Sequence, residues 1–358
     1  MNIKQDYKKI DAAGMYTIIK EVPQQFEKAI ELSKNFKGFA DTKAMSYDLV
    51  IIGMGGSAIA GDILRDFFLH SQFKTKLKIH LSREYELPNF IDDKTYVICS
   101  SYSGETEETL QAFNEALTKT KRIACIASGG KLLELAKKNK LKYLQIPEGF
   151  QPRAALGYSL TAQFYTILNS CLITKTEGKK IIQAFTEAVS KLQPLSDMLS
   201  ITDDTNIAYN IAKIQHNSMP LIISSSKFRA VSLRWCGQIQ ENAKQICYST
   251  VLPEMNHNFV NSFENPKLII NKTSIINFMS KLDNERIAHR FAANIELLKD
   301  KVDSITDIAH AAEDYLSAIL ELIYLGDWVS YYLAIIRGVD PTPIPMISKL
   351  KSIMSEKK

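Results

Sequence analysis

Between residues 47 and 146 the sequence alternates short runs of β-branched residues with longer stretches of helical periodicity. This alternation predicts a parallel sheet with helices on both faces, because parallel strands need long crossover connections that are usually helices. The expected strands cover 49–52, 77–81, 96–100, 122–126 and 143–146, and the expected helices cover 57–70, 105–119 and 131–138. The first forty residues should add helices around this unit.

The second half of the chain has the same order of a strand, a Ser- or Gly-rich turn and a helix. Its strands are expected at 221–224, 268–271 and 274–278, and its helices at 228–245, 284–298 and 314–337. A turn-rich stretch at 147–152 lies between the halves, and 358 residues exceed the size of one ordinary hydrophobic core. We therefore predict an α/β protein with two domains, residues 1–152 and 153–358, each a parallel sheet flanked by helices on both faces.

The charge and hydropathy of the sequence disfavour nucleic acid and membranes as partners. Lys and Arg (44) exceed Asp and Glu (39) by five, without the basic, aromatic-interleaved stripe typical of proteins that bind single strands. The first residues lack the apolar core of a signal peptide, and the apolar stretch 315–336 contains Glu321 and Asp327. Five widely spaced cysteines are typical of reduced thiols, so we expect a cytoplasmic protein.

The first expected strand ends in a glycine-rich turn that leads directly into a helix. Gly56 and Ser57 lie in this turn, where backbone N–H groups at a helix N-terminus can approach an anion closely. The turn also matches the G-x-G-x-x-A fingerprint of nicotinamide dinucleotide enzymes, which expects an acidic residue about 20 positions further on, at the end of the second strand. The nearest candidates, Glu84 and Glu86, lie about 30 positions on and outside the strand, which weakens the dinucleotide interpretation.

The third expected strand ends in a turn rich in hydroxyl groups. Ser101, Ser103 and Thr106 place several donors beside a second helix N-terminus, at the carboxyl end of a parallel strand, where ligands of open α/β sheets bind. The alternative is that these residues only cap the helix, since Ser or Thr followed three residues later by Glu is a capping box. Because a similar turn follows the first strand, we predict that the two turns bind the phosphate of a small molecule.

Three further residues are candidates for catalysis. Arg153 lies between the expected domains, and its guanidinium can stabilise an oxyanion; an exposed, salt-bridging arginine is the alternative. Glu241, near the end of an expected helix, and His257, in the loop that follows, offer a carboxylate and an imidazole for acid–base chemistry. A solvated helix residue and an ordinary loop residue are the alternatives for these two.

Taken together, these segments resemble the bifunctional phosphoglucose/phosphomannose isomerase family, whose members carry two sugar isomerase (SIS) domains. The resemblance rests on residues 53–61, 100–110, 152–158, 241–244, 253–258 and 337–351, in the order expected for the family. One departure is Glu105, where the family usually has asparagine. A carboxylate at this position would repel phosphate unless it points outward.

The resemblance implies a role for each candidate. The residues that would bind the substrate phosphate are Gly56, Ser57, Ser101, Ser103 and Thr106. Arg153 would lie against the reacting carbons, Glu241 would be the base, and His257 would be the ring-opening acid. A lysine near the C-terminus also takes part in the family, and the local motif points to Lys351, with Lys349 as the alternative.

The implied reaction interconverts glucose 6-phosphate or mannose 6-phosphate with fructose 6-phosphate through a cis-enediolate. It needs no cofactor, and six scattered histidines without an i, i+4 pair do not indicate a metal site. The small-molecule partner would thus be a hexose 6-phosphate, and the resemblance also implies a homodimer in which His257 is donated to the neighbouring subunit's site. The alternative function is a non-catalytic SIS protein that binds a sugar phosphate, which would not need Glu241 and His257.

Overall fold

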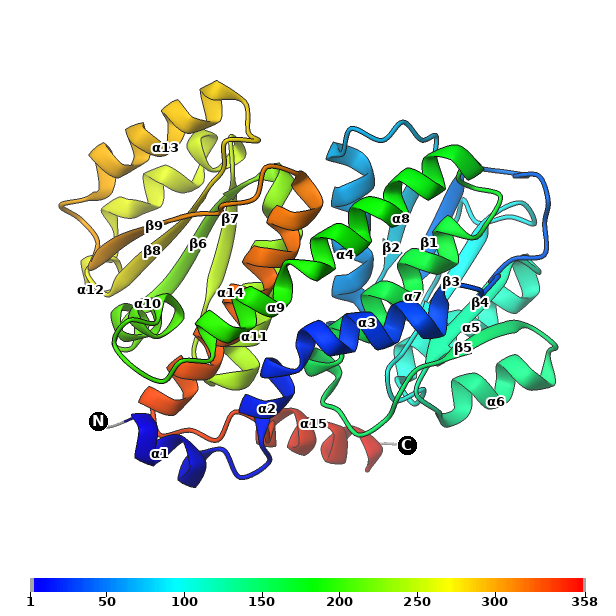
Figure 1. Ribbon diagram of the computed structural model, residues 1–358, viewed down its shortest axis with the longest axis horizontal. Coiled ribbons are helices and arrows are strands. Elements are labelled where there is room, and N and C mark those ends of the chain that lie inside the picture. Colours follow the sequence, from blue (N-terminus) through cyan, green and yellow to red (C-terminus); the bar gives the residue numbers. More distant parts are fainter. Residues whose placement is uncertain (1–2, 357–358) are drawn as a thin grey trace.

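The computed structural model describes residues 3–356, and Figure 1 shows two parallel sheets with helices packed on and between them. The first sheet has the strand order β2-β1-β3-β4-β5, and the second has the order β7-β6-β8-β9. The strands of the first sheet are β1 (Asp48–Ile52), β2 (Lys78–Ser82), β3 (Tyr96–Ser100), β4 (Ile123–Ala127) and β5 (Lys142–Gln145). Those of the second are β6 (Met219–Ser225), β7 (Tyr248–Leu252), β8 (Thr273–Met279) and β9 (Ser304–Ala309). The expected α/β fold with two parallel sheets is confirmed.

Alternate side chains of the first sheet are buried on opposite faces, as the pleat of a strand requires. Ile51 and Ile98 belong to the core on one face, and Val50 and Val97 belong to the core on the other. The helices of the first face are α3 (Val22–Ser33), α4 (Gly55–His70) and α7 (Leu156–Leu168), and those of the second face are α5 (Glu107–Lys119) and α6 (Gly130–Lys138). Both faces are covered, which explains why the central strands β1, β3 and β4 are almost continuously apolar.

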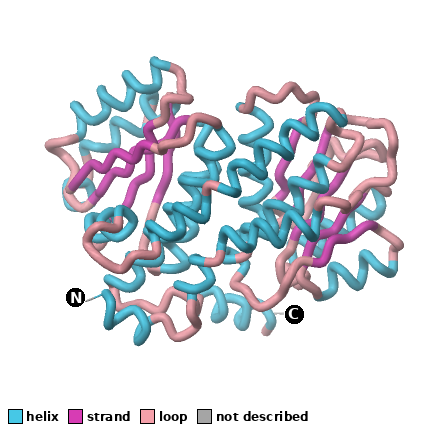
Figure 2. Tube along the Cα trace, viewed as in Figure 1, coloured by secondary structure: helices cyan, strands magenta, loops and turns pink. Residues whose placement is uncertain are grey.

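The second sheet is also covered on both faces. Ile223 packs with Phe291 on one face, and Ile222 shares a core with Trp235 on the other. The helices that carry these contacts are α13 (Glu285–Leu298) on the first of these faces, and α11 (Arg229–Asn242) and α14 (Tyr315–Ile336) on the second. Figure 2 shows the helices that fill the space between the two sheets.

The helix α14 is long and apolar enough to cross a membrane by length and composition, but 89% of its apolar window is buried inside the molecule. Its Asp327 carboxylate accepts hydrogen bonds from Arg234 Nη2 at 2.9 Å and from Gln238 Nε2 at 2.7 Å. Burial raises the pKa of Asp327, and the charge of Arg234 opposes this shift. Of the two acidic residues that interrupt this apolar stretch, Asp327 therefore belongs to an internal ion pair of a core helix.

A charged contact joins the two halves at the helices α4 and α11. Arg229 Nη2 donates to Asp62 Oδ1 at 2.8 Å and to Asp66 Oδ1 at 3.1 Å, and Ala230 N donates to Asp66 Oδ2 at 2.9 Å. The two carboxylates thus lie at the N-terminus of α11, where the helix dipole favours negative charge. The helix that follows the first turn and the helix that carries Glu241 are held together by this contact.

The boundary expected after residue 152 falls next to a helix that belongs with the first sheet. The helix α7 packs against α4 and β4, and Gln163 Nε2 donates to Ser57 O and to Ser100 Oγ, both at 3.0 Å. The division into residues 1–152 and 153–358 stays a prediction.

The strand expected at 268–271 is wrong, and two strands of the second sheet were not expected. The run Lys-Leu-Ile-Ile forms the one-turn helix α12 (Lys267–Ile270), in which Leu268 is 81% exposed. The missed strands β7 and β9 are the edges of the sheet, and both contain several polar residues, in the sequences Tyr-Ser-Thr-Val-Leu and Ser-Ile-Thr-Asp-Ile-Ala. An edge strand is only half buried, so it lacks the apolar run that reveals a central parallel strand.

The remaining elements lie around and between the sheets. They are α1 (Ile3–Ile10), α2 (Met15–Lys20), η1 (Pro152–Ala154), α8 (Lys175–Ser190), α9 (Leu192–Leu199), α10 (Ile207–Gln215), η2 (Ser226–Phe228), η3 (Glu254–His257), η4 (Phe259–Glu264) and α15 (Pro345–Ser355).

Candidate functional site

The two predicted turns lie together at the carboxyl edge of the first sheet. Tyr102 N in the second turn donates to Ser57 Oγ in the first at 3.0 Å, and this contact is buried. Gly56 lies against the segment that carries Arg153, because a Cβ at Gly56 would lie 2.9 Å from the carbonyl of Pro152. The absence of a side chain at Gly56 therefore allows the first turn to approach the segment between the two sheets.

The second turn holds its hydroxyl groups by internal hydrogen bonds. Ser101 Oγ and Thr106 Oγ1 are 2.9 Å apart, and Gly104 N donates to Ser101 Oγ at 3.2 Å. Thr106 is the N-cap residue of α5, yet in the described chain its side chain makes no capping hydrogen bond. Ser101 is buried and Ser103 is exposed, so the turn presents hydroxyl groups at two depths. Helix capping alone does not explain this arrangement.

The carboxylate of Glu105 points away from these hydroxyl groups. Glu105 Oε1 accepts a hydrogen bond from Lys131 N at 2.7 Å, at the N-terminus of α6. This contact places the negative charge where a helix dipole favours it. The backbone of the turn passes close to that helix because Gly104 has a φ of +71°, and a Cβ there would lie 2.0 Å from Gly129 O. The glutamate at this position is thus turned outward from the hydroxyl cluster.

Arg153 is buried, with 2% of its surface exposed, so the alternative of an exposed arginine is wrong. Its Nε donates to Asn242 Oδ1 at 2.6 Å, and its Nη1 donates to Glu241 Oε2 at 3.2 Å. Its Nη2 donates to Pro341 O at 2.7 Å and to Thr342 O at 2.9 Å. Burial lowers the pKa of the guanidinium, and the charge of Arg234 adds to this effect, while Glu241 opposes it. The structure therefore brings Arg153 and Glu241 together.

A cavity of about 360 Å³ connects the first turn with this arginine–carboxylate pair. Its lining residues are Gly55, Gly56, Ile59, Arg83, Arg153, Leu233, Arg234, Gly237, Gln238 and Glu241. The side chain of Glu241 is 29% exposed, so it is accessible from the cavity while paired with Arg153. The first turn of one sheet and the Glu241 carboxylate of the other therefore line one cavity.

The other polar residues of this cavity, Arg83, Arg234 and Gln238, were not predicted from the sequence. Arg234 and Gln238 precede Glu241 by seven and three residues on α11, so all three share one helix face. Arg234 Nη2 also donates to Arg153 O at 2.7 Å. Arg83 directly follows β2 at the carboxyl edge of the first sheet. Two features of the sequence could have revealed these residues: the helical spacing of Arg234 and Gln238 from Glu241, and the position of Arg83 directly after a strand.

Of the predicted residues, Gly56, Arg153 and Glu241 are among the described residues that line the cavity, and the others are not. Ser57, Ser101, Ser103 and Thr106 lie in the two turns at the carboxyl edge of the first sheet, and His257, Lys349 and Lys351 lie on other elements. His257 is exposed at the end of η3, and both lysines are exposed on α15, at the lower edge of the molecule in Figure 1. Within residues 3–356, His, Cys, Asp and Glu side chains form no group of three or more that could hold a metal ion.

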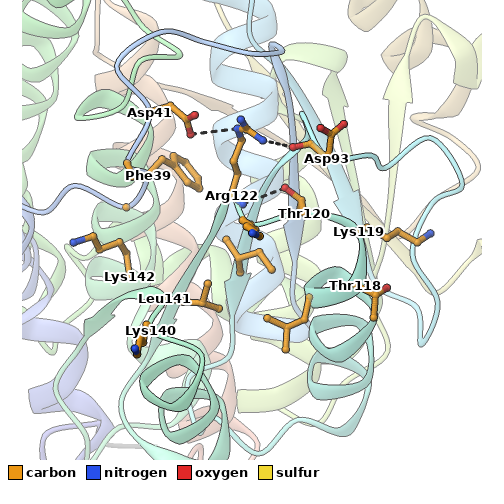
Figure 3. A pocket seen from close by; sticks show the side chains of 15 residues that line it. Phe39, Asp41, Asp93, Thr118, Lys119, Thr120, Arg122, Lys140, Leu141 and Lys142 are labelled. Atoms are coloured by element: carbon orange, nitrogen blue, oxygen red, sulfur yellow. Dashed lines mark hydrogen bonds and ion pairs between the residues drawn. The ribbon is translucent and has the colours of Figure 1, made fainter.

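A second hollow, of about 580 Å³, lies at the opposite, amino edge of the first sheet (Figure 3). Lys119, Lys140 and Lys142 surround it, and Arg122 forms an ion pair with Asp41 at 3.3 Å. The helices α5 and α6 end at this edge, and the C-terminus of a helix carries a partial negative charge. We interpret the basic side chains as compensation for these helix ends, so the hollow is not assigned as the site.

Replacing two hydroxyl groups of the second turn tests its capacity to bind an anion. We expect Ser103→Ala combined with Thr106→Ala to weaken the binding of inorganic phosphate at least about 10-fold in isothermal titration calorimetry. The reason is that one hydrogen bond to a charged group contributes about 1.5–3 kcal/mol. Thr118→Ala, at the other end of α5, is the control and should leave binding unchanged. Unchanged phosphate affinity in the double variant would remove this site.

Comparisons with known proteins identify similar sequences. The family described as "Bacterial phospho-glucose isomerase C-terminal SIS domain" matches residues 204–354. A bifunctional phosphoglucose/phosphomannose isomerase of Caldicellulosiruptor bescii is 37% identical over 96% of this chain and 99% of its own length. A protein of the same description from Aquifex aeolicus is 33% identical over 85% of this chain and 89% of its own length.

Solved structures share the fold at low sequence identity. The C-terminal domain of glucosamine-fructose-6-phosphate aminotransferase from Francisella tularensis has a TM-score of 0.70 at 14% identity. The superposition covers 92% of this chain and 98% of that domain. At this identity the likeness concerns the fold alone.

Proposed function

The chain belongs to the family of bifunctional phosphoglucose/phosphomannose isomerases, and on this premise we propose that it interconverts glucose 6-phosphate and mannose 6-phosphate with fructose 6-phosphate. The observation that carries the proposal is the cavity in which the first turn faces Arg153 and Glu241. The turns after β1 and β3 would hold the phosphate, and the sugar would extend towards α11. In this arrangement the phosphate is bound at the first sheet, and proton transfer takes place at Glu241 on α11.

The reaction follows from the chemistry of the facing groups. Glu241 takes the proton from C2 of the open-chain aldose, and the electrons of that C–H bond form the C1–C2 double bond of an enediolate. Arg153 faces the developing negative oxygen with its buried guanidinium. The carboxyl group of Glu241 then returns the proton to C1, while the oxygen on C1 gains a proton and the hydroxyl group on C2 loses one, which leaves the carbonyl at C2. Glucose 6-phosphate and mannose 6-phosphate differ only at C2 and give the same enediolate, so one base serves both.

His257 is proposed to act in the site of a second copy of the chain. The helix α11 begins at the carboxyl edge of the second sheet and has 14 residues, which corresponds to a length of about 21 Å. Glu241 lies in the last turn of α11. His257 instead follows β7, and the last residue of that strand, Leu252, pairs with Ser225, which ends β6 shortly before α11 begins. Glu241 therefore lies towards the amino ends of the strands of the second sheet, and His257 lies at their carboxyl ends. A homodimer would let the exposed His257 reach the neighbouring site as the ring-opening acid.

The lysine of α15 is proposed to assist ring opening. Lys351 and Lys349 are both exposed on this helix, and we keep Lys351 as the first choice and Lys349 as the alternative. The connection between α14 and α15 passes the site, because the carbonyl groups of Pro341 and Thr342 bind Arg153. A cytoplasmic location also belongs to this proposal, since all five cysteines are free thiols in the described chain.

A coupled assay for fructose 6-phosphate, run in excess EDTA, tests the proposal. We expect turnover of both glucose 6-phosphate and mannose 6-phosphate at rates that EDTA does not change, because the proposed groups are side chains of the protein. Binding of both sugars without turnover would contradict the proposal and support a sugar-phosphate-binding protein. Loss of activity in EDTA that added zinc restores would contradict the metal-independent mechanism.

A further inference from the structure

Lys244 follows the helix that carries Glu241 and has an unusual backbone conformation. Its φ is +51°, in the left-handed region where glycine or asparagine usually ends a helix. A residue with a Cβ is held in this region only when its surroundings favour the conformation. Here the side chain returns towards the helix end, and its Nζ donates to Asn242 O at 3.2 Å and to Asp340 O at 2.7 Å.

The second of these contacts belongs to a short segment that two cationic side chains hold. We call residues 340–342 the C-terminal arm, since they connect α14 to α15. Lys244 binds the carbonyl group of Asp340, and Arg153 Nη2 binds the carbonyl groups of Pro341 and Thr342. Three consecutive carbonyl groups of the arm thus accept hydrogen bonds from these two residues.

The orientation of Arg153 depends on this arm. Its guanidinium has one edge on the C-terminal arm, through Nη2, while Nη1 faces Glu241 and Nε binds Asn242. Because the guanidinium is a rigid planar fork, the position of Nη2 determines where Nη1 points. A shift of the arm would therefore turn Arg153 relative to the carboxylate.

We propose that Lys244 is a positioning residue for Arg153: by holding Asp340 O it fixes the C-terminal arm, and the arm fixes the guanidinium against Glu241. This inference rests on the proposed function where it concerns activity, but the fixing of the arm does not depend on that function. The groups that face the Lys244 ammonium are Arg153, Asp340 and Glu241.

The same surroundings make the contact sensitive to pH. Burial and the charge of Arg153 lower the pKa of Lys244 to about 8, while Asp340 and Glu241 oppose the shift. The ammonium is charged below this pKa and becomes neutral as the pH rises through it. A neutral amine is a weaker donor to Asp340 O than an ammonium is. Activity should therefore fall as the pH rises through about 8, as the arm loosens.

Two substitutions separate the positioning role from a general loss of structure. Lys244→Met removes the donor but keeps the length of the side chain, and we expect kcat to fall by about 10- to 100-fold with KM changed much less, because Arg153 is misplaced. Lys244→Arg keeps a charged donor that does not titrate near pH 8. It should retain near-neutral activity within about 3-fold of the wild type and lose the alkaline decline. Lys299→Met is the matched control, because Lys299 follows α13 and contacts Glu296 of its own helix.

Hydrogen–deuterium exchange of peptides that cover residues 339–350 provides a readout without substrate. Exchange should be faster in Lys244→Met than in the wild type, unchanged in Lys244→Arg and unchanged in Lys299→Met. Equal exchange and equal kcat in Lys244→Met and the wild type would overturn the proposal. An alkaline decline that persists unchanged in Lys244→Arg would overturn its pH dependence. If the wild-type protein isomerises no sugar phosphate, the proposed function fails, and the exchange experiment still decides whether Lys244 fixes the arm.

Discussion

Glu241→Gln should lower kcat by about 10²- to 10⁴-fold for both glucose 6-phosphate and mannose 6-phosphate, because it removes the only proposed base of a shared enediolate. Glutamine keeps the shape of the side chain and can still accept the hydrogen bond from Arg153 Nη1, which lies 3.2 Å from Glu241 Oε2. Substrate binding should remain largely intact, since the proposed phosphate turns belong to the first sheet. Initial rates and the affinity for fructose 6-phosphate are the measurements.

The matched control for this substitution is Glu296→Gln. Glu296 is an exposed helix residue of the second sheet that pairs with Lys299 of its own helix, so its loss should leave kcat unchanged. Circular dichroism and the urea midpoint establish that both variants are folded. Survival of turnover for one of the two aldoses in Glu241→Gln would mean that two different bases act, and the shared enediolate would be rejected.

The second large effect is the return of activity when two inactive variants are mixed. We expect Glu241→Gln and His257→Ala to be nearly inactive alone. When the two proteins are unfolded together and refolded, about half of the dimers are mixed if pairing is random. If Glu241 and His257 of one site come from different chains, each mixed dimer contains one intact site and one doubly substituted site. The mixture should then recover about a quarter of the wild-type activity.

The geometry of the chain makes this result decisive. The length of α11 separates Glu241 from the edge of the sheet where His257 lies, so one chain does not place both at its own cavity. Native mass spectrometry of tagged chains confirms that mixed dimers have formed. Mixed dimers that remain as inactive as the parents would show that both residues of a site come from one chain. The proposed exchange of His257 would then be abandoned.

The first sheet and the two turns at its carboxyl edge could be predicted from local patterns of residues. Each strand expected there is present within a residue or two, because apolar runs and helical periodicity are local properties of the chain. The turns were found for the same reason: glycines and hydroxyl residues directly follow β1 and β3, and the carboxyl ends of parallel strands lie at one edge. Local patterns failed at β7 and β9, where half-buried edge strands carry polar residues.

The grouping of the candidate residues depends on the packing of distant segments. In the sequence Arg153 resembled a surface residue. Packing buries it between the turn at Gly56 and the C-terminal arm, and gives it Glu241 as a partner. The same packing places His257 at the far edge of the second sheet, although only 16 residues separate it from Glu241 in the chain. Burial and pairing of charged groups depend on contacts between segments far apart in sequence. The docking of α4 against α11 is one such contact, and no local pattern of residues encodes it.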